Sequence, residues 1–280
     1  MPMPEHLGKP KIVVTNALWD DATKRSGAYL KDIIEKCKEK LNAYDVRLLR
    51  GVLDTKENYR REAPSACLHI GTGHGRPPEY LGWANKGILN TEDERKYKEG
   101  MIHYLVACHL AKELGPNLIK DGAKAFLGFK DEVKMVASAN KDPLKDRFLK
   151  ATIGPLWEGL PKLLEGGTIQ EAKQAIFRAL QREFHEWKDK NQLVAGIIEW
   201  NYEQLQLMGD PNARLIEPQE PPSPPPSHPE SGDLDIDLVL EPITVPVEIK
   251  LKVFGYTIPF KTSIEIPEQR LKGKGIPKRS

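Results

Sequence analysis

Short apolar runs alternate with longer amphipathic stretches through the first half of the sequence. These runs are Lys11–Asn16, Val46–Leu49, Ala66–Ile70, Met101–Cys108 and Ala123–Phe129. Each run has the length of a strand, and the stretch Gly27–Ala43 repeats apolar residues at the three- and four-residue steps of a helix. Strands and helices in this rhythm predict an α/β domain, with a mostly parallel sheet flanked by helices on both faces.

Beyond Leu144 the apolar periodicity becomes helical. The predicted helices are Leu156–Leu164, Thr168–Asp189 and Gln192–Leu207. Thr168 and Glu171 have the spacing of a capping box, in which each side chain accepts a backbone N–H from the other residue. We therefore expect one large domain over residues 1–216.

Residues 217–231 contain seven prolines and almost no apolar side chains. Such a segment is extended and cannot join a packed core, so it predicts a linker. Residues 232–280 then alternate apolar and polar side chains, as in Val247–Val253, which is typical of a small antiparallel sheet with one wet face. A module of this size rarely folds alone, so we expect it to dock on the main domain, on a second copy of the chain, or on a protein partner.

The charge balance and the cysteine content exclude several classes of function. The 42 Lys and Arg residues are nearly matched by 40 Asp and Glu, which gives no electrostatic basis for binding nucleic acid or an anionic membrane. No run approaches the ~20 apolar residues of a membrane span, and the first residues lack the apolar core of a secretory signal. Cys37, Cys67 and Cys108 form no CxxC pair, so we expect no metal or other cofactor and a reducing, cytoplasmic environment.

Two segments end an apolar strand in a chemically reactive side chain. In Leu68–Gly75, an apolar strand is followed by His74, which lies between two glycines. In Tyr104–Leu110, Cys108 lies at the end of the next predicted strand. An imidazole near a thiol can take its proton and later protonate a leaving amine. A helix predicted over Leu110–Lys120 would put the sulfur near a helix N-terminus, where the thiolate is favoured.

The order of these motifs resembles that of the caspase/gingipain clan of cysteine peptidases, which includes caspase-like, gingipain-type and CHAT domains. Thr72–Gly75 is similar to the clan's His motif, and Val106–His109 is similar to its Cys motif. Downstream, Gly166–Ala172 resembles a helix opening of gingipain-type catalytic domains, and Gly209–Pro211 resembles their ending. The resemblance covers residues 10–216 and implies a caspase-like sheet.

The resemblance also implies roles for individual residues. His74 would be the base and Cys108 the nucleophile of a Cys–His dyad that cleaves peptide bonds. The backbone amides of Gly75 and Cys108 would form the oxyanion hole. In the clan, the end of the first strand helps to build the pocket for the residue before the cut. Asp20 and Asp21 follow that strand here, and an acidic pocket would favour Arg or Lys.

Some positions depart from the clan or have simpler interpretations. Val106 stands where caspases carry Gln and metacaspases an acidic residue, which leaves the specificity of the pocket open. Cys108 could be a packing thiol, and His74 could be a turn residue. His109 is a second candidate base. Whether calcium activates the protein, as it does some clan members, is not readable from the residues.

Three functions are compatible with these patterns. The first is a cysteine endopeptidase that acts on a protein or peptide substrate. The second is a catalytically silent caspase-like module that binds partners through its C-terminal β segment. The third is a hydrolase or acyltransferase that uses the same dyad on non-peptide substrates. A thiol-reactive probe separates the first two, because it labels Cys108 only where an activated thiol faces a cleft.

Overall fold

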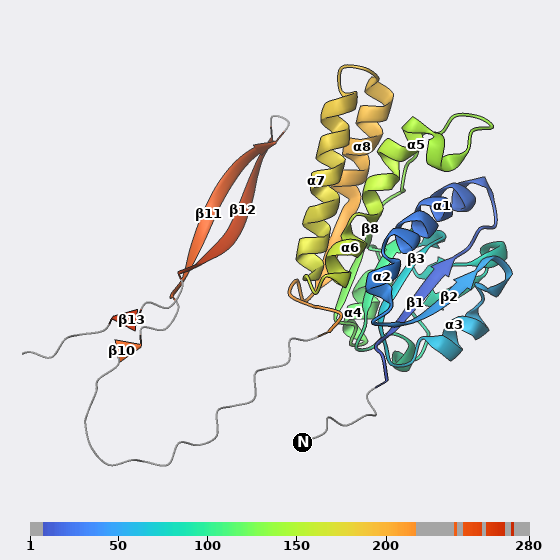
Figure 1. Cartoon of the computed structure of the whole chain (residues 1–280), viewed down its shortest axis with the longest axis horizontal. Helices are drawn as coiled ribbons and strands as arrows, with labels where there is room; N and C mark the ends of the chain where they lie inside the picture. The colour runs from blue at the N-terminus through green and yellow to red at the C-terminus, as the bar shows by residue number, and fades with distance from the viewer. Residues whose placement is uncertain (1–7, 217–237, 240–242, 254–255, 267–269, 272–280) are drawn as a thin grey trace, which may run out of the picture. The chain divides into compact units, whose positions relative to one another are not determined.

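The computed structural model describes residues 8–216, 238–239, 243–253, 256–266 and 270–271. The chain divides into two compact units, Met1–Gln219 and Glu220–Ser280. Figure 1 labels many of the helices and strands of the two units. The predicted proline-rich linker, residues 217–231, lies outside the described residues.

A six-stranded sheet forms the centre of the first unit (Figure 1). Its strands, in spatial order, are β2 (Asp45–Arg50), β1 (Lys11–Asn16), β3 (Ala66–Thr72), β7 (Ile102–Val106), β8 (Ala125–Phe129) and β9 (Leu205–Gly209). All neighbouring strands run parallel except β8 and β9, which are antiparallel. The predicted mostly parallel sheet is confirmed, and an antiparallel edge strand is added to it.

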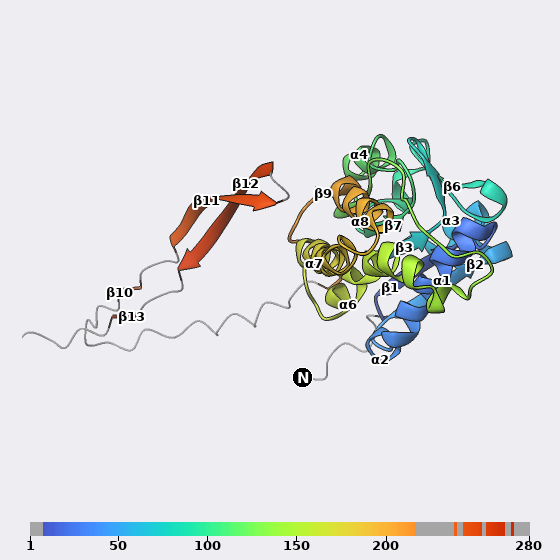
Figure 2. The ribbon, with the colours of Figure 1, turned by 90° about the horizontal axis from the view of Figure 1, so that it is seen from above.

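Helices flank the sheet on both faces, as the alternating pattern predicts. They are α1 (Asp21–Lys36), α2 (Lys38–Leu41), α3 (Lys56–Glu62), α4 (Leu114–Lys120), α5 (Arg147–Thr152), α6 (Gly159–Leu164), α7 (Ile169–Trp187) and α8 (Gln192–Gln204), with 3-10 turns at Gly51–Leu53, Trp83–Asn85, Arg95–Tyr97, Pro143–Lys145 and Gly154–Trp157. Because successive strand residues point to opposite faces, Val14 and Ile70 pack with α1 and α5–α8, whereas Val13 and Leu105 pack with α3 and α4. Figure 2 shows α4 and α3 on the side of the sheet opposite α6 and α7.

A second, three-stranded antiparallel sheet follows β3 directly. Its strands are β4 (His74–Arg76), β5 (Glu79–Leu81) and β6 (Gly87–Asn90), in that order. The sequence predicts a long loop here because Pro77, Pro78 and several glycines interrupt the apolar pattern. The prolines instead occupy the turn between β4 and β5, and the strands are too short to show alternation. His74 is therefore the first residue of a paired strand and does not lie in a loop.

The start of α7 agrees with the sequence prediction, whereas the end of α8 does not. The predicted capping box of α7 is present: the Thr168 hydroxyl accepts the Glu171 N–H at 3.1 Å, and the Glu171 carboxylate accepts the Thr168 N–H at 2.7 Å. The predicted extension of the last helix to Leu207 is wrong. It ends at Gln204, because Leu205–Gly209 pair with the free edge of β8.

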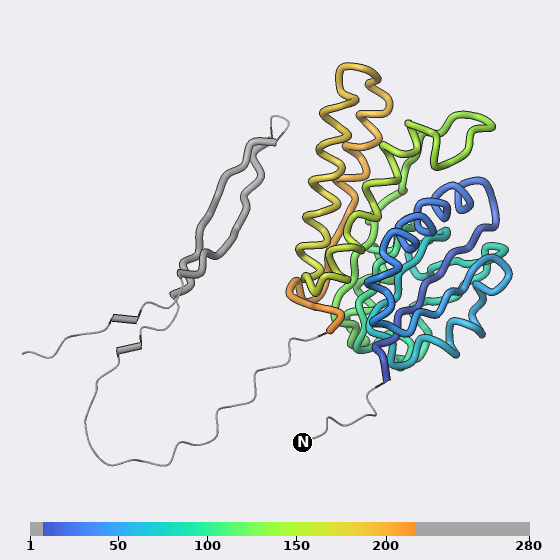
Figure 3. Tube along the Cα trace, in the orientation of Figure 1, coloured from blue at the N-terminus to red at the C-terminus, as the bar shows by residue number. Residues whose placement is uncertain are grey.

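The chain between β8 and β9 makes an excursion that begins and ends at one place on the sheet. It leaves at Phe129, passes through α5–α8 and returns at Leu205, which pairs with Phe129 (Figure 3). Residues Val133 and Met135, just after β8, line the pocket described below. The excursion therefore supplies part of the site as well as helices for one face.

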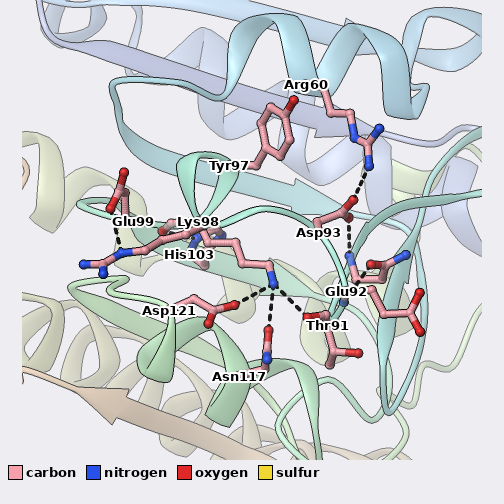
Figure 4. A network of polar contacts seen from close by, with 12 residues as sticks. Arg60, Thr91, Glu92, Asp93, Tyr97, Lys98, Glu99, His103, Asn117 and Asp121 are labelled. Carbon is pink, nitrogen blue, oxygen red and sulfur yellow. Dashed lines mark hydrogen bonds and ion pairs between the residues drawn. The ribbon is translucent and has the colours of Figure 1, made fainter.

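A buried lysine joins the second sheet to the helix that follows Cys108. The side chain of Lys98 is fully buried, and its Nζ donates to the Thr91 carbonyl at 3.0 Å, to Asn117 Oδ1 at 2.8 Å and to Asp121 Oδ2 at 2.7 Å (Figure 4). All three of its donors are thus satisfied, as a buried ammonium requires. Thr91 follows β6, and Asn117 lies in α4. The hydrogen bonds of Lys98 therefore link the second sheet to α4.

The second unit contains antiparallel strand pairs. Its strands are β10 (Leu238–Val239), β11 (Ile243–Val253), β12 (Tyr256–Ile266) and β13 (Arg270–Leu271). β11 pairs with β12 along its full length, and β10 pairs with β13. Antiparallel pairing is what the alternating pattern predicts for the C-terminal module.

Candidate active site

Cys108 lies in a turn just past the carboxyl end of β7, which ends at Val106. The predicted helix over Leu110–Lys120 begins only at Leu114, so the sulfur is not at a helix N-terminus and that argument for a thiolate is wrong. The residues before Leu114 form a turn instead: the Leu114 N–H donates to the Pro77 carbonyl at 2.8 Å and not to Leu110, and His109 has a left-handed φ of +63°. Such a conformation is uncommon for a non-glycine residue and cannot be read from the sequence.

The environment of the Cys108 sulfur keeps the thiol protonated. Partial burial raises its pKa, although the Val133 N–H, which donates to Sγ at 3.3 Å, favours the thiolate. The carboxylates of Glu132 and Asp131 raise the pKa further. A base is therefore needed to activate this thiol at neutral pH.

His74 begins β4, two residues after the end of β3. Its Nε2 lies 2.5 Å from Asp20 Oδ2. Because a carboxylate can only accept, Nε2 carries the proton, and Nδ1 is left as the basic ring nitrogen. Asp20 therefore sets the tautomer and the orientation of the ring.

Asp20 is the N-cap of α1, which explains why that helix begins at Asp21 and not at Gly27 as predicted. Its Oδ1 accepts the Thr23 N–H at 2.9 Å, and its Oδ2 accepts His74. Burial opposes ionisation, but the Thr23 N–H and His74 together hold the Asp20 pKa below its usual value. One carboxylate thus anchors the helix and holds the histidine.

His74 and Cys108 line the same pocket, which has a volume of about 90 Å³. The pocket lies at the carboxyl ends of β3 and β7, which are neighbouring strands. The other side chains around it are uncharged: Ala22, Thr23, Ser26, Thr72, Val106, Ala107, Val133 and Met135. A small uncharged group is what such a surface accommodates best.

The backbone of Gly75 packs against the Cys108 turn. A Cβ added to Gly75 would stand 2.2 Å from the Cys108 carbonyl oxygen and 2.8 Å from Leu110 Cδ2. Only glycine allows this approach. The two residues predicted to supply oxyanion amides are therefore brought together by direct backbone contact.

The remaining predicted residues lie in different surroundings. Asp21 is exposed and pairs with Arg25 at 2.6 Å, and both line a neighbouring pocket with Ala139 and Asn140. Asp21 is absent from the walls around Cys108. His109 lies 3.3 Å from Asp131 and points to that carboxylate. The structure thus brings Asp20 to His74 and keeps Asp21 apart.

In the part of the chain that the structure describes, no group of three His, Cys, Asp or Glu side chains could hold a metal ion. No helix there is long and apolar enough to cross a bilayer. Cys37 and Cys67 are free thiols outside the pocket. Burial raises the pKa of both, to about 11 for Cys67.

We expect alkylation of Cys108 by iodoacetamide to accelerate about tenfold per pH unit between pH 6 and 8 without levelling off, because the raised pKa makes thiolate a minor species there. Mass spectrometry of the Cys108 peptide after timed quenching measures the rate. Cys67, with its pKa of about 11, is the internal reference for an inactive thiol. A rate that reaches a plateau near neutral pH would show instead a stable thiolate–imidazolium pair.

Comparison with known proteins gives structural likenesses alone. No protein-family model matches the sequence, and no curated protein matches it. Among solved structures, a complex of Porphyromonas gingivalis RgpB pro- and mature domains aligns with a TM-score of 0.46 and 10% identity, over 73% of this chain and 48% of that one. The Arg-specific cysteine proteinase gingipain R aligns with a TM-score of 0.47 and 10% identity, over 73% and 46%. The chain spans just under half the length of each.

Proposed function

We propose that the protein is a cysteine-type peptidase, with Cys108 as nucleophile, His74 as base and Asp20 as the residue that positions His74. The observation that supports this most directly is the shared pocket: Cys108 and His74 line it together, and His74 Nε2 is held by Asp20. A nucleophile, a base and a group that orients the base are the minimum for activating a protonated thiol.

The proposed reaction uses the free Nδ1 of His74. Nδ1 takes the thiol proton as Sγ attacks the carbonyl carbon of the peptide bond. The tetrahedral intermediate then breaks its C–N bond, and the imidazolium returns the proton to the leaving amine. Water, deprotonated by the same nitrogen, attacks the thioester carbonyl carbon. The C–S bond then breaks, the imidazolium returns the proton to Cys108 Sγ, and the acyl fragment leaves as a carboxylic acid. The backbone N–H groups of Gly75 and Cys108 are the proposed donors to the developing oxyanion, each worth about 3 kcal/mol.

The pocket walls favour a small uncharged residue before the cleaved bond. The carboxylates that the sequence suggests for binding Arg or Lys are those of Asp20 and Asp21. Asp20 is already bonded to His74 and to the Thr23 N–H, and Asp21 is exposed beside Arg25. The side chains that would meet the substrate, such as Ser26, Val106 and Met135, carry no charge. We therefore propose Ala, Ser, Gly or a residue of similar size at that position.

The two aspartates allow a direct test of this assignment. We expect Asp20→Asn to lower kcat about 10- to 1,000-fold for every peptide of a fluorogenic library, because the imidazolium loses its carboxylate. Asn caps helices as well as Asp, so α1 should remain intact. Asp21→Asn is the matched control and should leave all rates within about twofold.

Selective loss of Arg or Lys cleavage in either aspartate variant would contradict the small uncharged pocket. It would restore the acidic pocket that the sequence suggests. A uniform loss in Asp20→Asn, with unchanged ranking of the peptides, supports the positioning role.

A catalytically silent binding module is the second candidate, and the raised pKa of Cys108 favours it. A peptide acyloxymethyl ketone with alanine next to the warhead separates the two. A peptidase is labelled at Cys108, and His74→Ala prevents that labelling. A silent module is not labelled by this probe in either form.

A further inference from the structure

A second, larger depression lies on the other side of the first half of α1. It is about 750 Å³ in volume, and Lys24, Ala28 and Lys31 line it at the four- and three-residue steps of one helix face. The residues Ala22 and Ser26 of the same helix line the pocket of Cys108. We call the larger depression the α1 groove; Arg50, Val52, Trp83 and Leu144 complete its main walls.

The α1 groove presents large apolar side chains to solvent. Val52 is 65% exposed and Leu144 is 45% exposed. Beyond its rim, Trp19, which packs edge-on against Trp83 with ring centroids 5.1 Å apart, is 42% exposed, and Leu53 is 53% exposed. Clustered exposure of this kind marks binding surfaces, because scattered single side chains are the norm on a monomer.

Three of the four charged side chains that line the α1 groove are basic. Lys24, Lys31 and Arg50 are exposed, and within the described residues their side chains make no hydrogen bond or ion pair. Their counterpart in the lining is Asp142, whose carboxylate already accepts the Leu144 N–H at 2.9 Å. Neighbouring cations such as Arg25 and Lys36 do have acidic partners. The groove therefore has positive charges that lack a partner among the residues that the structure describes.

The loops that build the α1 groove hold backbone conformations that side chains disfavour. Leu18, Ala84 and Asn85 have φ values of +50°, +58° and +56°. Leu18 lines the groove, and the other two follow Trp83 directly. Strained conformations of this kind concentrate at sites where a ligand is held.

We propose that the α1 groove binds an acidic peptide segment that carries large apolar side chains. Apolar residues of the peptide would cover Val52, Trp83 and Leu144, while its carboxylates pair with Lys24, Lys31 and Arg50. The apolar exposure continues past the rim to Trp19 and Leu53, over a larger surface than a small anion covers. The basic side chains therefore favour a partner with negative charge. The extent of the exposed apolar surface favours a peptide segment over a small anion.

Fluorescence anisotropy tests this with full-length protein and a labelled short peptide of alternating glutamate and leucine. We expect saturable binding that weakens with added NaCl, because exposed charge pairs are screened. The double variant Lys31→Glu/Arg50→Glu should raise Kd about tenfold or more. Val52→Asp should weaken binding similarly through the lost apolar contact and the added like charge. Cys108→Ala should bind as the unaltered protein does.

Matched variants outside the α1 groove control for general effects of charge and polarity. Lys188→Glu reverses an exposed cation, and Leu193→Asp replaces a side chain that is 66% exposed at the start of α8. Neither should change Kd more than about twofold. Equal binding of a lysine–leucine peptide or of polyglutamate, or an unchanged Kd in both groove variants, would overturn the proposal. The proposal would also be overturned if no peptide binds and the protein forms a dimer that Val52→Asp dissociates. That result would assign the groove to self-association.

Discussion

Replacement of Cys108 by alanine is expected to abolish peptide hydrolysis, with a loss of about 10⁴-fold or more in kcat. The variant removes the proposed nucleophile, and no other thiol lines the pocket. The fold should persist, because within the described residues the sulfur accepts a single hydrogen bond, from the Val133 N–H, and the side chain is only partly buried. Rates on a fluorogenic peptide library, with the thermal midpoint as a measure of folding, test both parts.

Two further variants make the Cys108 result specific. Cys67→Ala removes another partly buried thiol, outside the pocket, and should retain full activity. His74→Ala alone should cost about as much as the double variant His74→Ala/Cys108→Ala, because residues that act as one unit are not additive. Hydrolysis that survives in Cys108→Ala would remove the nucleophile from the proposal.

Replacement of Gly75 by alanine should also be strongly damaging, although it removes neither reacting side chain. The new methyl would stand 2.2 Å from the Cys108 carbonyl oxygen, a backbone atom that cannot rotate away, and 2.8 Å from Leu110 Cδ2. Either β4 or the Cys108 turn must then move, which displaces His74 or the sulfur. We expect a loss of at least about 100-fold in kcat and a lower thermal midpoint, since displacements near 1 Å have this effect on reacting groups.

Measurement below the thermal midpoint, with circular dichroism as a check, separates lost catalysis from unfolding. Gly196→Ala is the matched control: it adds a methyl to an exposed glycine of α8 with no atom within 4 Å. That change should leave kcat unaltered and stabilise the fold by up to about 1 kcal/mol, because alanine is the better helix former. Full activity in Gly75→Ala would mean that Gly75 does not contact the Cys108 turn during turnover.

The sheet could be predicted from the sequence because each central strand carries its own apolar signal. The small β4–β6 sheet could not, since strands of three or four residues broken by Pro77 and Pro78 show no alternation. β9 was hidden for a different reason: Leu205 and Leu207 continue the periodicity of α8, and only the free edge of β8 makes them a strand. Long-range pairing overrides local pattern in such cases.

The candidate site, too, could be predicted only in part, because some of its contacts depend on how distant strands pair. The resemblance to the clan and the rule that sites form at the carboxyl ends of parallel strands predict that His74 and Cys108 lie close together, and they line one pocket. The bond between Asp20 and His74 joins residues 54 positions apart. It follows from the register in which Asn16 of β1 pairs with Thr72 of β3, so that the residues just past both ends are neighbours. Sequence patterns contain the residue types but not that register.

The pairing of Phe129 with Leu205 has a consequence for how such chains can diversify. The chain leaves and re-enters the sheet at one rung, so insertions or deletions between these residues leave the alignment of β3 and β7, and with it the spacing of His74 and Cys108, unchanged. The same excursion carries Val133 and Met135 into the pocket. Changes in its length can therefore alter the walls of the pocket without displacing His74 and Cys108.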